Sequence, residues 1–282
     1  MKKNNILDLE VLDVIKAKYE EIFAAEKKVA DFILQNPQKA VDSNVSELAK
    51  QSGVSDATVV RMCHHIGYSG YYQFRITLAR DLGKKLHSGL AISKSSGAVE
   101  KLFEQYAKNI LSIGKTIKPN TMWNSVNLLK TCKEVHVIAV GNTCVLSQYM
   151  GFRLGRLGIK SSYGMSAEYF MNHVNLADSN DIVLAISKSG TSKPVLLGME
   201  LAKERGLKTI AITAHEQSPI SKLANYVLLA SGKDEDLNYY EDYAQTNMMA
   251  TIDALLNFVT NEDVIKKTQA DKPEIILSEY KL

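Results

Sequence analysis

The spacing of apolar residues divides this chain into two regions. In the first region, apolar residues recur mostly at three- and four-residue steps, which is typical of amphipathic helices. The pattern predicts a small helical bundle that ends near Asn36-Pro37. The residues that carry it are Leu7, Val11, Leu12, Val14, Ile15, Ile22, Phe23, Val29, Phe32 and Ile33.

The second region alternates short apolar runs with helical patterns. It opens with predicted helices over 100–117 and 122–130. Strands are then predicted over 135–140, 159–162, 182–186, 209–213 and 226–229, with helices between most of them. Because short apolar strands that alternate with helices are typical of a parallel sheet covered on both faces, we predict an α/β three-layer sandwich.

Two short helices around a tight turn are predicted after the amino-terminal bundle. Ser46 is the expected cap of a helix over 47–51 that stops at Gly53, and Ser55 is the expected cap of a helix over 56–65. A helix-turn-helix needs a small residue at the crossing, a turn residue that tolerates positive φ, and apolar residues facing back. These needs are met by Ala49, Gly53, Val59 and Met62.

The start of the second short helix is the predicted contact with DNA. The first turns of a recognition helix reach base edges and phosphates in the major groove. The candidates there are Ser55, Asp56, Ala57, Thr58 and Arg61. Between Arg61 and His87 there are five lysines and arginines and one acidic residue, Asp81, so the local net charge is five minus one, or +4. This charge favours contact with phosphates. The alternative is a plain helical pair in which Arg61 is a solvated charge.

Two loops at the carboxyl ends of predicted strands are candidate anion sites. The loop over 187–192 follows an apolar strand and leads into a helical pattern opened by Pro194. Its hydroxyls and backbone amides would converge at the positive end of that helix. The loop over 141–144 follows the first strand, and ligands of parallel sheets bind beyond such strand ends. The alternative for 187–192 is a polar turn without a ligand.

A serine- and glycine-rich stretch separates the two regions. It has little periodic apolar content and is predicted to be a linker between separately folded units. The predicted organisation is therefore a helix-turn-helix DNA-binding domain over 1–86, a linker over 87–99, an α/β domain over 100–270 and a tail over 271–282. The fold class is two domains, an all-α bundle followed by an α/β sandwich with a parallel sheet.

Composition fits two modest globular domains. The chain has 282 residues, of which 45% are hydrophobic and 23% charged, and its net charge of +3 is too small to indicate nucleic-acid binding by itself. The sequence offers no apolar run of the roughly 20 residues that span a bilayer, so we expect a cytoplasmic protein without membrane contact. Cys63, Cys132 and Cys144 fit neither a disulfide framework nor a paired-cysteine zinc site. For His64-His65 we expect polar surface, and we expect no metal and no cofactor.

Some remaining patterns are interpreted as structural. Gly151 and Gly155 lie within a helical pattern and are attributed to close packing, and Gly158 to a helix end. Cys144 is interpreted as a small buried residue. The helical apolar spacing over 242–259 predicts core or a subunit interface.

The amino-terminal region resembles a known family. Residues 45–61 (VSELAKQSGVSDATVVR) and 66–74 (IGYSGYYQF) are similar to the amino-terminal domain of RpiR-type bacterial transcriptional regulators, and the similarity extends upstream over 26–37. The loop over 187–192 resembles the phosphosugar-binding signature of sugar isomerase (SIS) domains, which these regulators carry after their DNA reader. The resemblance implies phosphate contacts from Ser187, Ser189, Gly190, Thr191 and Ser192.

The first loop departs from the family pattern. The family usually has glycine two residues beyond the first glycine and serine two further on, whereas this chain has Thr143 and Val145. A side chain at Thr143 reduces the room for a close approach of backbone but supplies a hydroxyl. Ser147, one helical turn later, could compensate. The ligand contacts predicted in this loop are Gly141, Asn142 and Thr143.

We therefore expect a regulator of sugar or amino-sugar metabolism that binds double-stranded operator DNA and a phosphosugar effector. The resemblance implies a homodimer or homotetramer. We expect no enzymatic activity and assign no catalytic residue. One alternative is a phosphosugar isomerase, for which nothing in the spacing singles out a base among Glu168, His173, His215 and Glu241. A second is a DNA-binding regulator with a vestigial sensor.

Overall fold

The computed structural model describes residues 10–87, 97–164, 166–232, 245–260 and 272–278. The chain forms two compact units, one helical and one α/β, and they divide between Gln105 and Tyr106. The helical bundle followed by an α/β domain with a parallel sheet confirms the predicted fold class. The predicted linker over 87–99 lies mostly outside the described residues, and the predicted domain boundaries stay predictions.

The amino-terminal unit is a bundle of helices around one apolar core. Its helices are α1 (Val11–Lys18), α2 (Ala24–Gln35), α3 (Pro37–Asp42), α4 (Val45–Ser52), α5 (Asp56–His65) and α6 (Tyr71–His87). Fully buried side chains from several of these helices meet in its centre, including Ile15, Ile33, Leu48, Met62 and Phe74. The helical spacing of apolar residues is confirmed for most of the predicted positions. Phe23 is the exception, since it precedes α2 and is 67% exposed, and Leu7 lies outside the described residues.

The helix-turn-helix forms where it was predicted, but one cap is different. Asn44, not Ser46, caps α4: its side chain accepts a hydrogen bond from the Glu47 amide at 2.9 Å, and the Glu47 carboxylate accepts one from the Asn44 amide at 3.0 Å. Gly53 ends the helix with φ of 65°, as the turn requires. Ser55 caps α5, as predicted, by accepting from the Thr58 amide at 3.3 Å.

The second unit is a three-layer sandwich around a five-stranded parallel sheet. The strand order is β2-β1-β3-β4-β5. The strands are β1 (Val135–Ile138), β2 (Ser161–Tyr163), β3 (Ile182–Ile186), β4 (Lys208–Thr213) and β5 (Tyr226–Leu229). The helix α7 (Ala98–Thr116) spans the division between the two units. The remaining elements of the second unit are α8 (Pro119–Thr131), the single turn η2 (Gly141–Thr143), α9 (Cys144–Arg156), α10 (Ala167–Leu176), α11 (Lys193–Glu204), α12 (Pro219–Leu223), α13 (Thr246–Thr260) and α15 (Lys272–Ser278).

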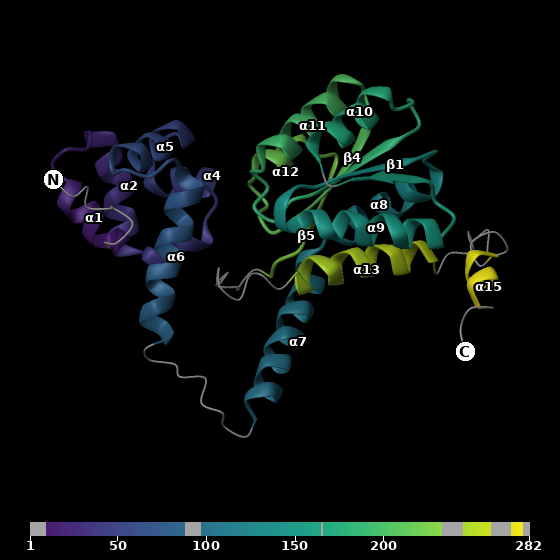
Figure 1. Cartoon of the computed structure of the whole chain (residues 1–282), viewed down its shortest axis with the longest axis horizontal. Coiled ribbons are helices and arrows are strands. Elements are labelled where there is room, and N and C mark those ends of the chain that lie inside the picture. The colour runs from purple at the N-terminus through teal and green to yellow at the C-terminus, as the bar shows by residue number, and fades with distance from the viewer. Residues whose placement is uncertain (1–9, 88–96, 165, 233–244, 261–271, 279–282) are drawn as a thin grey trace. The chain divides into compact units, whose positions relative to one another are not determined.

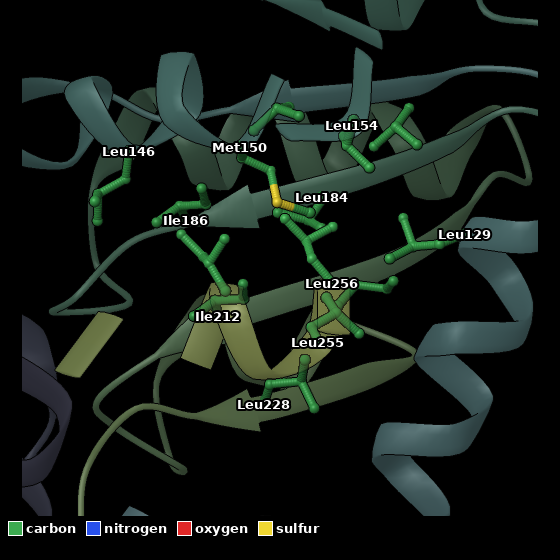
Figure 2. Packing of buried hydrophobic residues seen from close by; sticks show 14 of the residues in the cluster. Leu129, Leu146, Met150, Leu154, Leu184, Ile186, Ile212, Leu228, Leu255 and Leu256 are labelled. Atoms are coloured by element: carbon green, nitrogen blue, oxygen red, sulfur yellow. The ribbon is translucent and has the colours of Figure 1, made fainter. Parts of the chain in front are cut away.

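Helices cover both faces of this sheet (Figure 1). On one face, side chains of α8, α9 and α13 pack against the strands, and Figure 2 shows Met150, Leu184 and Leu256 within this cluster. On the other face, α10, α11 and α12 bury a second cluster that includes Phe170 and Met199. The run predicted to be core or interface is thus core over the α13 residues that face the sheet.

The glycines of α9 have different roles. A Cβ at Gly151 would lie 2.0 Å from the Tyr163 ring, so close packing explains that residue. Gly158 has φ of 74° just after the helix, as predicted for a helix end. The packing explanation is wrong for Gly155, because no described heavy atom lies within 4 Å of the Cβ position.

The described helices include none that is both long and apolar enough to cross a bilayer. Cys63, Cys132 and Cys144 are free thiols. Burial raises the pKa of Cys63 and raises the pKa of Cys132 to about 11, so these two suit packing rather than thiolate chemistry. Cys144 is half-buried at the start of α9.

Candidate functional site

The start of α5 presents a mostly exposed polar surface. Ser55, Asp56, Ala57 and Arg61 are all exposed. The Asp56 carboxylate accepts a hydrogen bond from the Ser46 hydroxyl at 2.5 Å, which joins the starts of α4 and α5. These exposed side chains are available to a groove of DNA, as a recognition helix requires.

Thr58 lies differently from the other predicted DNA contacts. It is only 5% exposed, and its hydroxyl forms a hydrogen bond with the Ser55 hydroxyl at 3.0 Å. The same oxygen accepts a hydrogen bond from the Arg61 guanidinium at 3.2 Å. Thr58 therefore holds the arginine on the exposed face, and the sequence pattern alone did not reveal this burial.

The positive charge counted over 61–87 is partly used inside the unit. The Arg75 guanidinium donates to the Ser43 carbonyl at 3.2 Å, and Arg80 pairs with the buried Asp81 at 3.3 Å. Asp81 also accepts from the Val11 amide at 2.9 Å. Among these arginines, Arg61 is the exposed one, so the phosphate-facing charge is smaller than the sequence count indicates.

The loop after β3 gathers hydroxyls at the carboxyl edge of the sheet. Ser187 donates to Ser192 at 3.3 Å, and Thr191 donates to Ser189 at 3.0 Å. Ser187 is 1% exposed, whereas Ser189, Thr191 and Ser192 are half-buried. Among the described side chains, none caps α11 at its N-cap Ser192. First-turn amides of a helix lack partners within the helix, apart from Pro194, which has no N–H.

Gly190 is fixed by the neighbouring β4–α12 loop. It has φ of 63°, and a Cβ there would lie 2.0 Å from the Oγ of the fully buried Ser218. The Gly190 carbonyl accepts from the Ile220 amide at 3.1 Å. The Lys188 carbonyl accepts from the Thr213 hydroxyl at 3.0 Å. Sequence reasoning missed Thr213, the last residue of β4, and Ser218, the cap of α12, because neither has a recognisable spacing to 187–192.

Thr143 connects the first loop to the second. Its hydroxyl donates to the Val140 carbonyl at 3.0 Å and lies 3.1 Å from the Ile186 carbonyl, at the end of β3. The residue that departs from the family pattern therefore links the first loop to the end of β3, immediately before the second loop. Gly141 and Asn142 are exposed beside it, and the two predicted loops lie at one edge of the sheet.

Ser147 does not replace the missing loop serine. It is fully buried, and its hydroxyl donates to the Cys144 carbonyl at 2.6 Å within α9. Of the bases considered for an isomerase, Glu168 and His173 lie on α10 and His215 follows β4, while Glu241 lies outside the described residues.

Two family models match this chain. The first, described as a helix-turn-helix domain of the rpiR family, matches residues 9–85, and the second, described as a SIS domain, matches residues 128–258. The chain belongs to the RpiR-type transcriptional regulators.

The relatives of this RpiR-type regulator share the whole architecture. It is 27% identical to an uncharacterized HTH-type transcriptional regulator of Haemophilus influenzae, over 95% of this chain and 97% of the relative. It is 27% identical to the HTH-type transcriptional regulator HexR of Pseudomonas aeruginosa, over 89% of each. The Vibrio vulnificus NanR protein complexed with ManNAc-6P has a TM-score of 0.81 at 22% identity, covering 96% of this chain and 98% of that one, which shows a shared fold.

These findings make the RpiR-type chain a transcriptional regulator with a DNA-binding helix-turn-helix domain and a SIS domain. The helix-turn-helix matches confirm the predicted class of DNA-binding protein. The two sequence relatives named above are described as transcriptional regulators. The individual DNA and ligand contacts of this RpiR-type regulator stay predictions.

Proposed function

We propose that this regulator senses a phosphosugar through its SIS domain and that the bound effector changes its affinity for operator DNA. The observation that carries the proposal is the loop over 187–192, where four hydroxyls surround the uncapped start of α11. A phosphate has oxygen acceptors for such hydroxyls and amides, and the helix dipole favours its negative charge.

The proposed effector site joins both loops at the carboxyl edge of the sheet. Phosphate would contact Ser187, Ser189, Gly190, Thr191 and Ser192. The sugar would face Gly141, Asn142 and Thr143 across the bridge that Thr143 makes to the end of β3. Lys193 is exposed at the start of α11 and would add positive charge. The contacts of Gly190 with the buried Ser218 and with the Ile220 amide support the proposal, because a loop that is already held in place loses little entropy on binding.

The class of effector is inferred from the related proteins. The NanR protein of Vibrio vulnificus forms a complex with ManNAc-6P, a phosphorylated amino sugar, and it shares this fold over nearly the whole chain. We therefore propose sugar or amino-sugar metabolism as the regulated process. Paired recognition helices would engage a twofold-symmetric operator, so we also propose a homodimer or homotetramer.

A pair of substitutions tests the two sites separately. Arg61→Ala should weaken operator binding at least tenfold and leave effector binding unchanged, because only the exposed guanidinium on α5 is lost. Ser189→Ala should weaken effector binding and leave effector-free DNA binding unchanged. Fluorescence anisotropy with labelled operator and calorimetry with hexose and N-acetylhexosamine 6-phosphates would measure the two affinities.

Matched controls separate local effects from loss of charge or of a hydroxyl. Lys16→Ala removes an exposed positive charge from α1, and Thr131→Ala removes an exposed hydroxyl from the end of α8. Both should behave like the unaltered chain. Binding of no phosphosugar by the folded protein would contradict the sensor proposal and favour a vestigial domain. Interconversion of a phosphosugar, followed by NMR, would instead favour the isomerase.

A further inference from the structure

A row of buried polar side chains crosses the sheet at the edge opposite the proposed effector site. The ring of His136, on β1, is joined by Nδ1 to the Ser162 hydroxyl of β2 at 2.7 Å. Its Nε2 lies 3.3 Å from the carboxylate of Asp181, which immediately precedes β3. All three residues are at least 93% buried. The row lies at the amino ends of β1 and β3, so the phosphosugar loops do not use it.

The row lies on the face of the sheet that α10 covers. Side chains alternate along a strand, so His136 shares the face of Ile138, which packs against Phe170 and Val174 of α10. A polar row is unexpected on this otherwise apolar face. One oxygen of Asp181, Oδ1, is buried and has no hydrogen-bond partner within the described chain, while Oδ2 accepts from the Asp178 amide at 2.6 Å.

Two further side chains complete the cluster. Glu134 immediately precedes β1, two residues before His136, and His173 lies on α10. One ligand atom from each of Glu134, His136 and His173 lies within 4.8 Å of the other two. The Glu134 carbonyl accepts from the Ile182 amide at 3.0 Å, which fixes that residue against β3.

We propose that Glu134, His136 and His173 bind a divalent transition-metal ion, with Zn²⁺ as the best match. Two imidazoles and one carboxylate form a ligand set that suits Zn²⁺ and related ions, whereas Mg²⁺ and Ca²⁺ prefer oxygen ligands. Ligand atoms around tetrahedral zinc are roughly 3.4 Å apart, from bonds of about 2.1 Å. The ligand atoms would approach one another by up to about 1.4 Å, which the half-buried Glu134 and His173 permit.

The buried row is the support that such a site needs. A histidine that binds metal through one ring nitrogen usually donates from the other to a carboxylate or another fixed group. His136 has such a partner on either nitrogen, Asp181 or Ser162, so one hydrogen bond remains whichever nitrogen binds the ion. Tyr169 packs on the His173 ring with centroids 4.4 Å apart and limits its rotation. The bound ion would fasten α10 to β1.

Metal titration of the chelator-treated, full-length chain tests this site. We expect one equivalent of Zn²⁺ by calorimetry, and no binding of Mg²⁺ under the same conditions. Zn²⁺ at a hundredfold excess over Kd should raise the melting temperature of the α/β unit by about 5 to 10 °C. Co²⁺ in its place should give the visible bands of a four-coordinate nitrogen and oxygen site, without a thiolate charge-transfer band.

Substitutions at the half-buried ligands assign the site. Glu134→Gln and His173→Ala should each lower Zn²⁺ affinity at least tenfold and remove the melting shift. His173→Gln keeps a polar side chain of similar size and should do the same, which guards against a folding defect in the alanine variant. His64→Ala is the matched control, since it removes an exposed helical histidine from α5. It should bind Zn²⁺ normally.

Three results would overturn the proposal. They are no Zn²⁺ binding by the folded chain, Zn²⁺ binding that survives in both His173 variants, and a Co²⁺ spectrum with a strong thiolate band, which would place the ion on cysteine. Neither the helix-turn-helix nor the phosphosugar loop enters these measurements, so the outcome is independent of the proposed effector function.

Discussion

At Gly190 two independent constraints act on one residue. Its φ of 63° lies in the left-handed region, and its missing Cβ leaves the space that Ser218 occupies. Ser218 cannot move aside easily because it is fully buried and its oxygen accepts from the Ser221 amide at 3.2 Å. The position of the hydroxyls in the loop over 187–192 therefore depends on Gly190, which has no hydroxyl of its own.

Gly190→Ala should disable the proposed effector site while the fold survives. The strained φ alone costs about 1–2 kcal/mol, and the contact with Ser218 adds to it. We expect a fall in melting temperature of roughly 4 °C or more, with loss of phosphosugar binding in calorimetry. Gly155→Ala, in open space within α9, should keep both properties and could stabilise the helix. Normal effector affinity in Gly190→Ala would show that the loop does not hold the phosphate.

Residue-scale features of the site were only partly predictable. The hydroxyl loop over 187–192 was recognisable because its members are adjacent in sequence. The burial of Thr58 and the bridge made by Thr143 were not, because each depends on which way one side chain turns after the helix has formed. The cluster of Glu134, His136 and His173 combines two residues at the start of β1 with one residue of α10, which is distant in sequence. No sequence spacing predicts such a cluster.

At the scale of elements, caps and turns position the recognition helix. The α4–α5 angle is set by the cap at Asn44, the left-handed turn at Gly53 and the cap at Ser55. The sequence predicted both helices and two of these three residues. The predicted cap at Ser46 was wrong because the helix starts two residues earlier than predicted, and helix ends are the least certain part of a pattern.

Asn44→Ala should loosen the start of α4. A lost cap of this kind costs about 0.5–2 kcal/mol, and the Glu47 amide would lose its acceptor. Hydrogen exchange should quicken over α4 and the melting temperature of the helical unit should fall by roughly 4–8 °C per kcal/mol lost. Ser46→Ala breaks only an exposed contact with Asp56 and should have a smaller effect. Equal exchange rates in the two variants would contradict the assignment of the cap.

Strand positions were the most predictable elements. The limits of β3 and β5 match the prediction, because both are continuous apolar runs that begin just after a polar residue. The predicted start of β2 was too early, since the Ile159 amide donates to the Leu154 carbonyl and belongs to the end of α9. The hydrophobic pattern predicted the approximate position of β2, but its first residue depends on where the end of α9 leaves the chain free to become extended.

At the scale of the whole molecule, the proposed regulation is a statement about coupled binding. An effector that binds the DNA-competent and DNA-incompetent arrangements with equal affinity does not change the equilibrium between them, however tightly it binds. Regulation therefore requires a difference in affinity between these arrangements. Effects of this kind are typically about 5–150-fold.

The coupling must be equal in both directions, which gives a test that uses two separate measurements. If the effector changes operator affinity by a given factor, operator DNA must change effector affinity by the same factor. Anisotropy with and without effector gives the first factor, and calorimetry with and without operator gives the second, both at one salt concentration because DNA affinity depends strongly on salt. Ser189→Ala should retain effector-free DNA affinity and show a much smaller shift at the same effector concentration. An effector that binds with full affinity and leaves the operator curve in place would mean that this domain does not regulate the DNA reader.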